Sequence, residues 1–256
     1  FIKGRSEPII NRVKPRHAVE GDPNPAAIKV MAHMDEIALV VKRIESDGTL
    51  RVRPLGGLCP WNCGLGPVEI MGDEKLLLGV LSVGPGHVTE ETPESWSAEV
   101  FGGNKALTWQ QVRVFTRLTP TQLAAAGVHP GTRVVIAQSR RKLLQIGDCL
   151  AGYFLDNRVC ITIMLAAAKE LQAATKRPAQ DVYFVATCQE EIAGGSAAHA
   201  ARTLPGATTL ALDVGPVAQE YGTKLTNTPI VVYRDAAGVY TRAVCDRMVK
   251  LGRKLK

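Results

Sequence analysis

Two adjacent glutamates, Glu190 and Glu191, follow a short apolar segment at residues 182–187. The segment is rich in β-branched and aromatic residues and too short for an ordinary helix, so it predicts a strand buried on both faces. In open α/β sheets, sites form at the carboxyl ends of such strands. Adjacent side chains point in different directions, so one glutamate could bind a metal while the other handles a proton. The alternative is that both acids complement the dipole of a following helix.

Three further segments place a histidine or an acid at the end of an expected element. A strand starting near residue 28 ends at His33, and Asp35 shares its face if the chain stays extended. Asp156 stands at the start of a long helix, and another buried strand, TTLALDVG, ends on Asp213. A metal-binding imidazole usually donates its other N–H to a carboxylate, which Asp35 could supply. Each residue alone also fits a helix cap or a hydrogen-bonded strand edge.

Together, one histidine and several carboxylates at successive ends of one sheet match the needs of a two-metal site. Two divalent ions close together require a carboxylate that bridges them and further oxygen and nitrogen ligands on each. A residue that binds neither ion must then act as base toward the bridging water.

The elements that would position these residues are of two kinds. Up to residue 38 and from residue 145 onward, strands alternate with helices. Between them, short alternating runs such as LVVKRIE and TLRVRPL are separated by turns, which indicates a small antiparallel barrel or sandwich. We therefore predict a catalytic α/β domain in residues 1–38 and 145–256, interrupted by an inserted β-rich domain in residues 39–144.

Local signals predict three smaller elements. Thr119 as N-cap, Pro120 in the first turn and Gly127 past the end indicate a short helix. Residues 229–240 predict a β hairpin, and the stretch from Thr241 predicts a basic helix that runs to the end of the sequence.

Composition excludes several classes of protein. With 46% hydrophobic and 21% charged residues the chain is ordinary globular material. It has no long apolar run and no signal-peptide pattern, so we expect a cytoplasmic protein without a membrane partner. Six cysteines without secretory context indicate reduced thiols. The net charge of +7 could suit nucleic acid, but most basic residues are scattered and lack interleaved aromatics, so we expect a solvated basic surface and no nucleic-acid partner.

Four segments, in order and spacing, resemble one known family: AHMDEIALVVKRIESDGTLRVRPLGG, LDNR, VATCQEE and LALDVG. The chain is similar to the co-catalytic metallo-aminopeptidases, which include the tetrahedral aminopeptidases, the glutamyl aminopeptidases and proteins once labelled endoglucanase or cellulase M. The resemblance implies a mixed-sheet, phosphorylase/hydrolase-like metallopeptidase domain with an inserted barrel-like dimerisation domain. It also implies removal of the N-terminal residue from short peptides, and assembly into homo-oligomers, which are dimers or dodecamers built from dimers.

The same resemblance implies two divalent metal ions per subunit, usually zinc or cobalt. Carried over residue by residue, His33 would bind one metal and Asp156 would bridge both. Asp213 would complete the protein ligands of the first metal, and Glu191 would bind the second. Glu190 would be the general base.

The resemblance further implies that Asp35 orients the histidine ligand. The chain departs from the family pattern at two places. The family has a final histidine ligand far downstream of the position of Asp213, whereas no histidine follows His199 here. Ala193 and Ser196 stand where the family usually has glycines, so we expect a less permissive turn after the glutamates.

Three functional hypotheses follow. The first is a dinuclear metallo-aminopeptidase, and the second is a catalytically impaired oligomeric scaffold related to such enzymes. The third, glycan hydrolysis by two carboxylates, does not need His33 or Asp213. We expect the 256 residues to be a fragment incomplete at both ends, because stopping after a strand and a helix would leave a parallel sheet with an uncovered edge or face.

Overall fold

The computed structural model describes residues 27–84, 107–176 and 178–255. The chain forms two compact units, Phe1–Asp213 and Val214–Lys256, and each is described here by itself. Residues 1–26 of the predicted catalytic domain and residues 85–106 of the predicted inserted domain lie outside the described residues. The predicted domain limits at residues 38/39 and 144/145 stay predictions.

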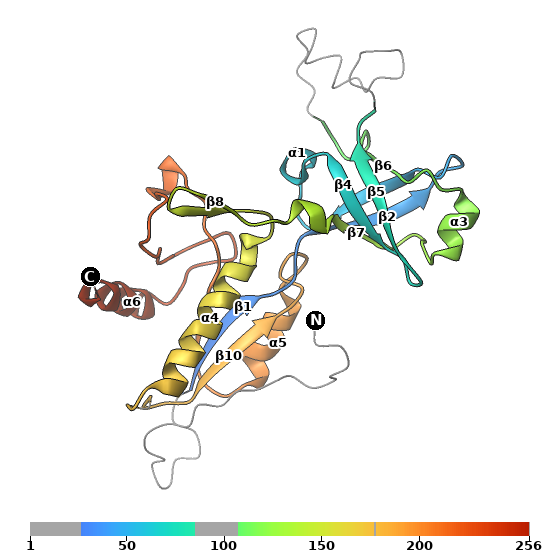
Figure 1. Cartoon of the computed structure of the whole chain (residues 1–256). Helices are drawn as coiled ribbons and strands as arrows, with labels where there is room; N and C mark the ends of the chain where they lie inside the picture. Colours follow the sequence, from blue (N-terminus) through green and yellow to red (C-terminus); the bar gives the residue numbers. More distant parts are fainter. Residues whose placement is uncertain (1–26, 85–106, 177, 256) are drawn as a thin grey trace. The chain divides into compact units, whose positions relative to one another are not determined.

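A parallel sheet of three strands carries the segments of interest in the larger unit (Figure 1). Its central strand, β1 (Ile28–His33), pairs with β10 (Val182–Thr187) on one side and with β11 (Thr208–Ala211) on the other. Because all three strands run in the same direction, their carboxyl ends meet at one edge of the sheet. The fold is therefore mixed α/β, as the sequence predicts.

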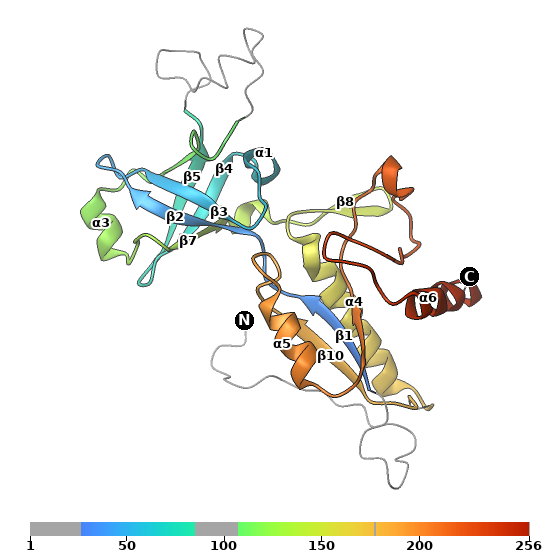
Figure 2. The same ribbon diagram turned by 180° about the vertical axis from the view of Figure 1, so that it is seen from behind.

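Helices α4 (Leu155–Ala173) and α5 (Gly195–Thr203) cover opposite faces of this sheet (Figures 1 and 2). Successive side chains of β1 point to alternate faces. On one face Ala32 packs against Cys160 and Met164 of α4 in a small buried core.

On the other face a buried lysine joins β1 to α5. Lys29 is 2% exposed, and its Nζ donates hydrogen bonds to the main-chain carbonyls of Ala201 at 2.9 Å, Leu204 at 3.4 Å and Gly206 at 2.5 Å. The last carbonyls of a helix have no partner within the helix, and a cation is favourable there. Lys29 thus caps the carboxyl end of α5 from inside the sheet.

The prediction that residues 182–187 form a strand buried on both faces is correct for the strand and wrong for the burial. Within β10 only Thr187 is buried, and the strand that precedes Asp213 has no buried residue. Among the described residues β10 and β11 are the two edges of the sheet. In addition, α5 consists mainly of small residues, which cover little of the strands beneath them.

Six antiparallel strands close into a barrel in the order β2–β3–β6–β5–β4–β7, as Figure 2 shows for most of them. Their bounds are Ala38–Ile44 (β2), Leu50–Leu55 (β3), Gly66–Met71 (β4), Leu76–Ser82 (β5), Arg113–Phe115 (β6) and Arg133–Ile136 (β7). Alternate side chains point inward and form the main core, which includes Leu50, Val68, Ile70, Leu81 and Val114. The predicted β-rich insertion is thus a closed barrel.

The short helix predicted after Thr119 is α3 (Pro120–Ala125). The Thr119 hydroxyl accepts the N–H of Gln122 at 3.2 Å, and the Gln122 side chain accepts the N–H of Thr119 at 2.9 Å. This capping box satisfies two N–H groups that the helix itself cannot. Gly127, with φ of +75°, follows the helix as predicted.

The remaining elements of the larger unit are short: α1 (Pro60–Cys63), a 3-10 turn (Gln138–Arg140), and the hairpin strands β8 (Leu144–Ile146) and β9 (Cys149–Ala151). Among the described residues, none of the helices combines the length and apolar character needed to span a membrane.

The smaller unit holds a 3-10 turn (Gln219–Tyr221) and the predicted basic helix, α6 (Arg242–Lys254). The hairpin predicted at residues 229–240 is reduced to one bridge between Arg234 and Val239. Asp235 Oδ1 accepts two main-chain N–H groups of the next residues and closes the turn. The flanking residues are mostly exposed, so little burial is available to extend the turn into strands.

Candidate metal centre

All six residues predicted for the site come from the carboxyl edge of the sheet and the start of α4. His33 is the last residue of β1. Glu190 and Glu191 follow β10, Asp213 follows β11, and Asp156 is the second residue of α4. The structure thus joins segments that are far apart in the sequence.

The buried imidazole of His33 is the centre of the group. His33 is 3% exposed. Its Nε2 lies 3.1 Å from Asp156 Oδ1, 3.8 Å from Glu190 Oε2 and 3.9 Å from Asp213 Oδ1. Carboxylates from three different elements therefore surround one ring nitrogen.

The other ring nitrogen faces Asp35. His33 Nδ1 lies 3.2 Å from the main-chain oxygen of Asp35 and 3.5 Å from its Oδ1. A carbonyl oxygen only accepts hydrogen bonds, so Nδ1 carries the proton in this contact. In a neutral ring the Nε2 lone pair then faces the carboxylates. These groups repel one another unless a proton or a cation lies between them. This is the arrangement that the predicted orienting role of Asp35 requires.

Asp35 also fixes the turn that carries the two glutamates. Its Oδ1 accepts the N–H of Glu190 at 3.3 Å, and its Oδ2 accepts the N–H of Glu191 at 3.4 Å. The same carboxylate therefore contacts the histidine and both glutamates. The sequence suggested only the first of these contacts, because nothing in it places β1 beside the turn after β10.

Glu191 forms a compact group with His33 and Asp156, in which one ligand atom from each lies within 4.8 Å of the others. Partial burial, the main cause, and the nearby charge of Asp156 raise the pKa of Glu191 to about 7. Burial likewise raises the pKa of Glu190. Acids whose pKa values are raised by burial and by a specific neighbouring charge cluster at functional sites.

His33 responds to the same charges. Burial acts to lower the pKa of His33, but the three carboxylates around Nε2, with Asp213 the strongest, outweigh it, so that the pKa is raised. The site holds more negative charge than its own groups balance, which favours a bound proton or cation.

Two neighbours of Asp156 hold the cluster together, and the sequence did not single them out. Asn157 is 1% exposed, and its Nδ2 donates to the main-chain oxygen of Leu212 at 2.9 Å, directly before Asp213. Arg158 pairs with Glu36, which follows Asp35 in the chain. The segment LDNR thus links the start of α4 to the residues that follow β11 and β1. Asn157, Arg158 and Glu36 all lie within two segments quoted above for the resemblance, LDNR and the one that begins with AHMDE.

The turn after the glutamates tolerates the residues that replace the family's usual glycines. Among the described non-glycine residues, only Arg117, Phe154 and Gln189 have a positive φ, so Ala193 and Ser196 need no glycine backbone. The Ser196 hydroxyl accepts the N–H of Cys188 at 3.1 Å. The turn therefore forms with Ala193 and Ser196 in place of the glycines.

The donor set fits a divalent metal. Imidazole nitrogen and carboxylate oxygen are the ligands of zinc and cobalt enzymes, and the protonated Nδ1 leaves Nε2 free to bind. His33, Asp156 and Glu191 are close enough to hold one ion. Glu190 and Asp213 stand at the same nitrogen within 4 Å.

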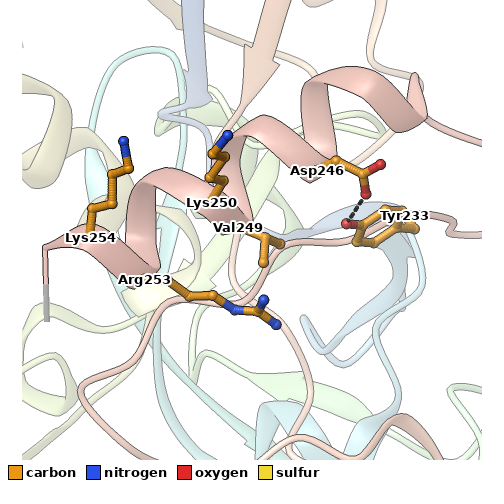
Figure 3. Close-up of a pocket in the computed structure, with 6 residues that line it drawn as sticks. All are labelled: Tyr233, Asp246, Val249, Lys250, Arg253 and Lys254. Carbon is orange, nitrogen blue, oxygen red and sulfur yellow. Dashed lines mark hydrogen bonds between the residues drawn. The ribbon is translucent and has the colours of Figure 1, made fainter.

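A hollow on the smaller unit contains none of these residues (Figure 3). It has a volume of about 510 Å³ and lies along α6. Its acid, Asp246, accepts a hydrogen bond from the Tyr233 hydroxyl at 2.7 Å. Its other polar groups are the cations of Lys250, Arg253 and Lys254, so it lacks the acidic ligands of the candidate metal centre.

The chain is similar in sequence to known aminopeptidases. Lysyl aminopeptidase of Pyrococcus furiosus is 30% identical over 188 residues, which are 73% of this chain and 50% of that protein. The chain spans about half the length of the curated relatives it matches.

Solved structures share the fold. A TET aminopeptidase from Thaumarchaeota archaeon SCGC AB-539-E09 superposes with a TM-score of 0.77 at 19% identity, covering 91% of this chain and 64% of that one. The TET1 peptidase of Pyrococcus horikoshii, described as able to assemble into a tetrahedron or a large octahedral shell, gives 0.73 at 22% identity, covering 90% and 66%. The model of the M42 glutamyl aminopeptidase family matches residues 17–256, and the chain belongs to this family.

Proposed function

We propose that this protein is a metal-dependent aminopeptidase that removes N-terminal residues from short peptides. The observation that carries the proposal is the ring of carboxylates around His33 Nε2, with Glu191 beside it. Membership of the M42 family and the similarity to a lysyl aminopeptidase support it.

We assign the metal ligands in two sets that share Asp156. His33, Asp156 and Asp213 would hold the first ion, and Asp156 and Glu191 would supply ligands to the second, with zinc or cobalt the ions that suit these donors. Bound divalent ions would polarise the scissile carbonyl and acidify a water molecule.

Glu190 serves as the general base. It takes a proton from the attacking water as the water oxygen bonds to the peptide carbonyl carbon, and it later gives a proton to the departing amine. Burial raises the pKa of Glu190, which makes it a stronger base than an ordinary glutamate. Asp35 keeps the imidazole and the main chain of both glutamates in place through the contacts described above.

The barrel supports a further part of the proposal, association of the chain with copies of itself. Its outer surface carries an apolar strip made of Met71, Leu76, Leu78, Val80 and Phe115, all more than 40% exposed. Direct cross-strand pairs, Met71 with Leu76 and Val80 with Phe115, make the strip continuous. Exposed apolar patches of this kind mark protein interfaces, and a shell-forming relative makes a second copy the natural partner.

The experiment that tests the activity is E190Q. The variant should bind zinc or cobalt with unchanged affinity and lose turnover of aminoacyl-p-nitroanilides by about a hundredfold or more. E170Q, an exposed acid on α4, is the matched control and should keep full activity.

Three results would contradict the proposal. Turnover by E190Q equal to that of the wild type would show that Glu190 is not the general base. A metal-loaded wild type without turnover would favour the scaffold hypothesis that the sequence left open. Failure of the wild type to bind metal would show that these residues do not form a metal centre.

A further inference from the structure

A hollow on the barrel gathers cations from separate parts of the sequence. It has a volume of about 320 Å³, and most of its lining residues belong to the neighbouring strands β2 and β3, which Figure 2 labels. Its lining consists of four cationic side chains, two polar or aromatic neighbours and one valine: Lys42, Arg43, Arg51, Arg53, Trp109, Gln110 and Val52. None of these residues belongs to the candidate metal centre, so the inference is independent of the proposed function.

The strand register sets like charges directly opposite one another. Arg43 of β2 pairs with Arg51 of β3, and Arg51 pairs in turn with Arg113 of β6. Three arginines therefore form one row across three neighbouring strands. Like charges directly opposite each other destabilise a sheet, so this row costs stability unless an anion lies against it.

Among the described residues, two carboxylates act on this row: Glu45 on Arg43 and Arg51, and Asp47 on Arg113, but only Glu45 pairs with cations that line the hollow. Glu45 Oε1 accepts from Arg43 Nη2 at 3.0 Å and from Arg51 Nε at 2.8 Å. Hydrogen bonds from both guanidiniums lower the pKa of Glu45, so it is ionised. No ion pair to Lys42 or Arg53 is found in the described part of the chain. The hollow thus keeps more positive than negative charge.

Two of the lining side chains are held in place before any ligand arrives. Arg51 is 22% exposed and is held by Glu45 and by the main-chain oxygen of Gln110. Trp109 is 9% exposed, and its Nε1 donates to the main-chain oxygen of Leu58 at 2.7 Å. Side chains that are already ordered lose less entropy when a ligand binds.

We propose that this hollow binds a compact oligophosphate, either inorganic or the phosphate tail of a nucleotide. Glu45, the carboxylate at the hollow, contacts two of its cations, Arg43 and Arg51, and does not reach Lys42 or Arg53. Adjacent phosphates offer many oxygens in a small volume and can contact several guanidinium and ammonium groups at once. The surplus charge and the size of the hollow match that chemistry.

The test is calorimetric titration of the metal-free wild-type protein with inorganic tripolyphosphate, in parallel with the double variant K42A/R53A. We expect wild-type binding that weakens between about 50 mM and 200 mM salt, and a loss of at least about tenfold in the variant. The control K169A/R202A removes the same charge from exposed positions on α4 and α5 and should bind as the wild type does. Circular dichroism verifies that each variant is folded.

Further probes identify the ligand. ATP that binds more tightly than tripolyphosphate supports the nucleotide source, and equal affinity supports the inorganic one. A triglutamate peptide that binds as tightly as tripolyphosphate would overturn the assignment to phosphate. The absence of wild-type binding, or an equal loss in the two double variants, would overturn the site.

Glu45, which pairs with two cations of the hollow, gives an independent test in which the affinity for tripolyphosphate should rise. E45Q frees Arg43 and Arg51 from their intramolecular partner, so tripolyphosphate should bind about threefold more tightly or better. E170Q changes the net charge equally but lies on α4, and its affinity should not change. Affinity in E45Q that is unchanged or weaker than in the wild type would contradict the proposed contacts.

Discussion

The Nδ2 of Asn157 donates to the main-chain oxygen of Leu212 at 2.9 Å, and so joins the residue after Asp156 to the residue before Asp213. Both carboxylates are proposed ligands of the same ion, and this bond holds the two segments that carry them together. The Oδ1 of Asn157 is buried without a hydrogen-bond partner among the described residues. The Asn157 side chain therefore positions these two segments, while its unpaired oxygen lowers the stability of the folded state.

We predict that N157A weakens zinc or cobalt binding by about 10–100-fold, the effect usual for partners that hold a metal ligand in place. The stability change should be modest, about 1–2 kcal/mol, because the substitution removes one buried unsatisfied oxygen and leaves another. Calorimetry with metal and thermal unfolding measure the two effects separately. C160A, buried on the same helix, is the control. Equal losses of metal affinity in both variants would mean that Asn157 acts only through packing.

Two metal ions should bind with unequal affinity. His33, Asp156 and Asp213 are the three proposed ligands of the first ion, whereas within these 256 residues Asp156 and Glu191 are the two proposed ligands of the second. In a titration with cobalt, D213N should weaken the tighter event and E191Q the weaker one. A single variant that removes both events equally would contradict the division of ligands.

The metal-free protein should become less stable as pH rises from about 5 to about 8. The pKa of Glu191 is about 7 in the folded chain against an ordinary value of 4.5, so the folded state keeps a proton that the unfolded state releases. That stability is present at pH below 4.5 and is lost as pH rises through about 7. The raised pKa values of His33 and His129 act in the same direction.

The measurement is thermal unfolding in EDTA across this pH range. E191Q removes one titrating group, so its melting temperature should change less with pH than that of the wild type. A bound metal must displace the same protons, and metal affinity should therefore rise over this range. A melting temperature that rises with pH in EDTA would contradict the assigned pKa shifts.

The sequence predicted those parts of the fold and site that depend on local signals. Strand β10, the capped helix α3 and the ends that carry His33 and Asp156 follow from periodicity, capping residues and turns. The convergence of His33 with three carboxylates was a hypothesis from the order of the elements, and the resemblance to known enzymes gave it residue numbers. The barrel was predicted as one of two options, and its closure needs six strands in register.

Contacts that connect distant segments could not be predicted in this way. The bonds from Asp35 to the main chain of the glutamates depend on β1 and β10 being neighbours, which no local pattern specifies. The incomplete burial of β10 was missed because apolar strand composition does not reveal how many strands lie beside it. The basic hollow was missed for a similar reason, since Lys42 and Arg53 are separated along the sequence but line the same hollow in the fold.

Lys29 should be essential for stability although it is far from the chemistry. K29M keeps an apolar stem but leaves the carbonyls of Ala201, Leu204 and Gly206 without their cation, so we expect a loss of about 3 kcal/mol. Chemical denaturation measures it. K169M, at an exposed position on α4, should change stability by less than about 0.5 kcal/mol. A stable K29M would show that water replaces the ammonium at the end of α5.

The apolar strip on the barrel predicts how association can be disrupted. Leu78 is 70% exposed in the middle of the strip, and in a contact between copies it would be buried. L78E would then place an unpaired charge in the interface, which should weaken association at least about tenfold. Light scattering coupled to gel filtration measures the mass of the wild type and the variant. L165E, on an equally exposed leucine of α4 at 65%, keeps the strip intact and should leave the mass unchanged. If L165E dissociates the protein while L78E does not, the contact lies on the α/β part instead of the barrel, because a buried charge disrupts only the surface on which it lies.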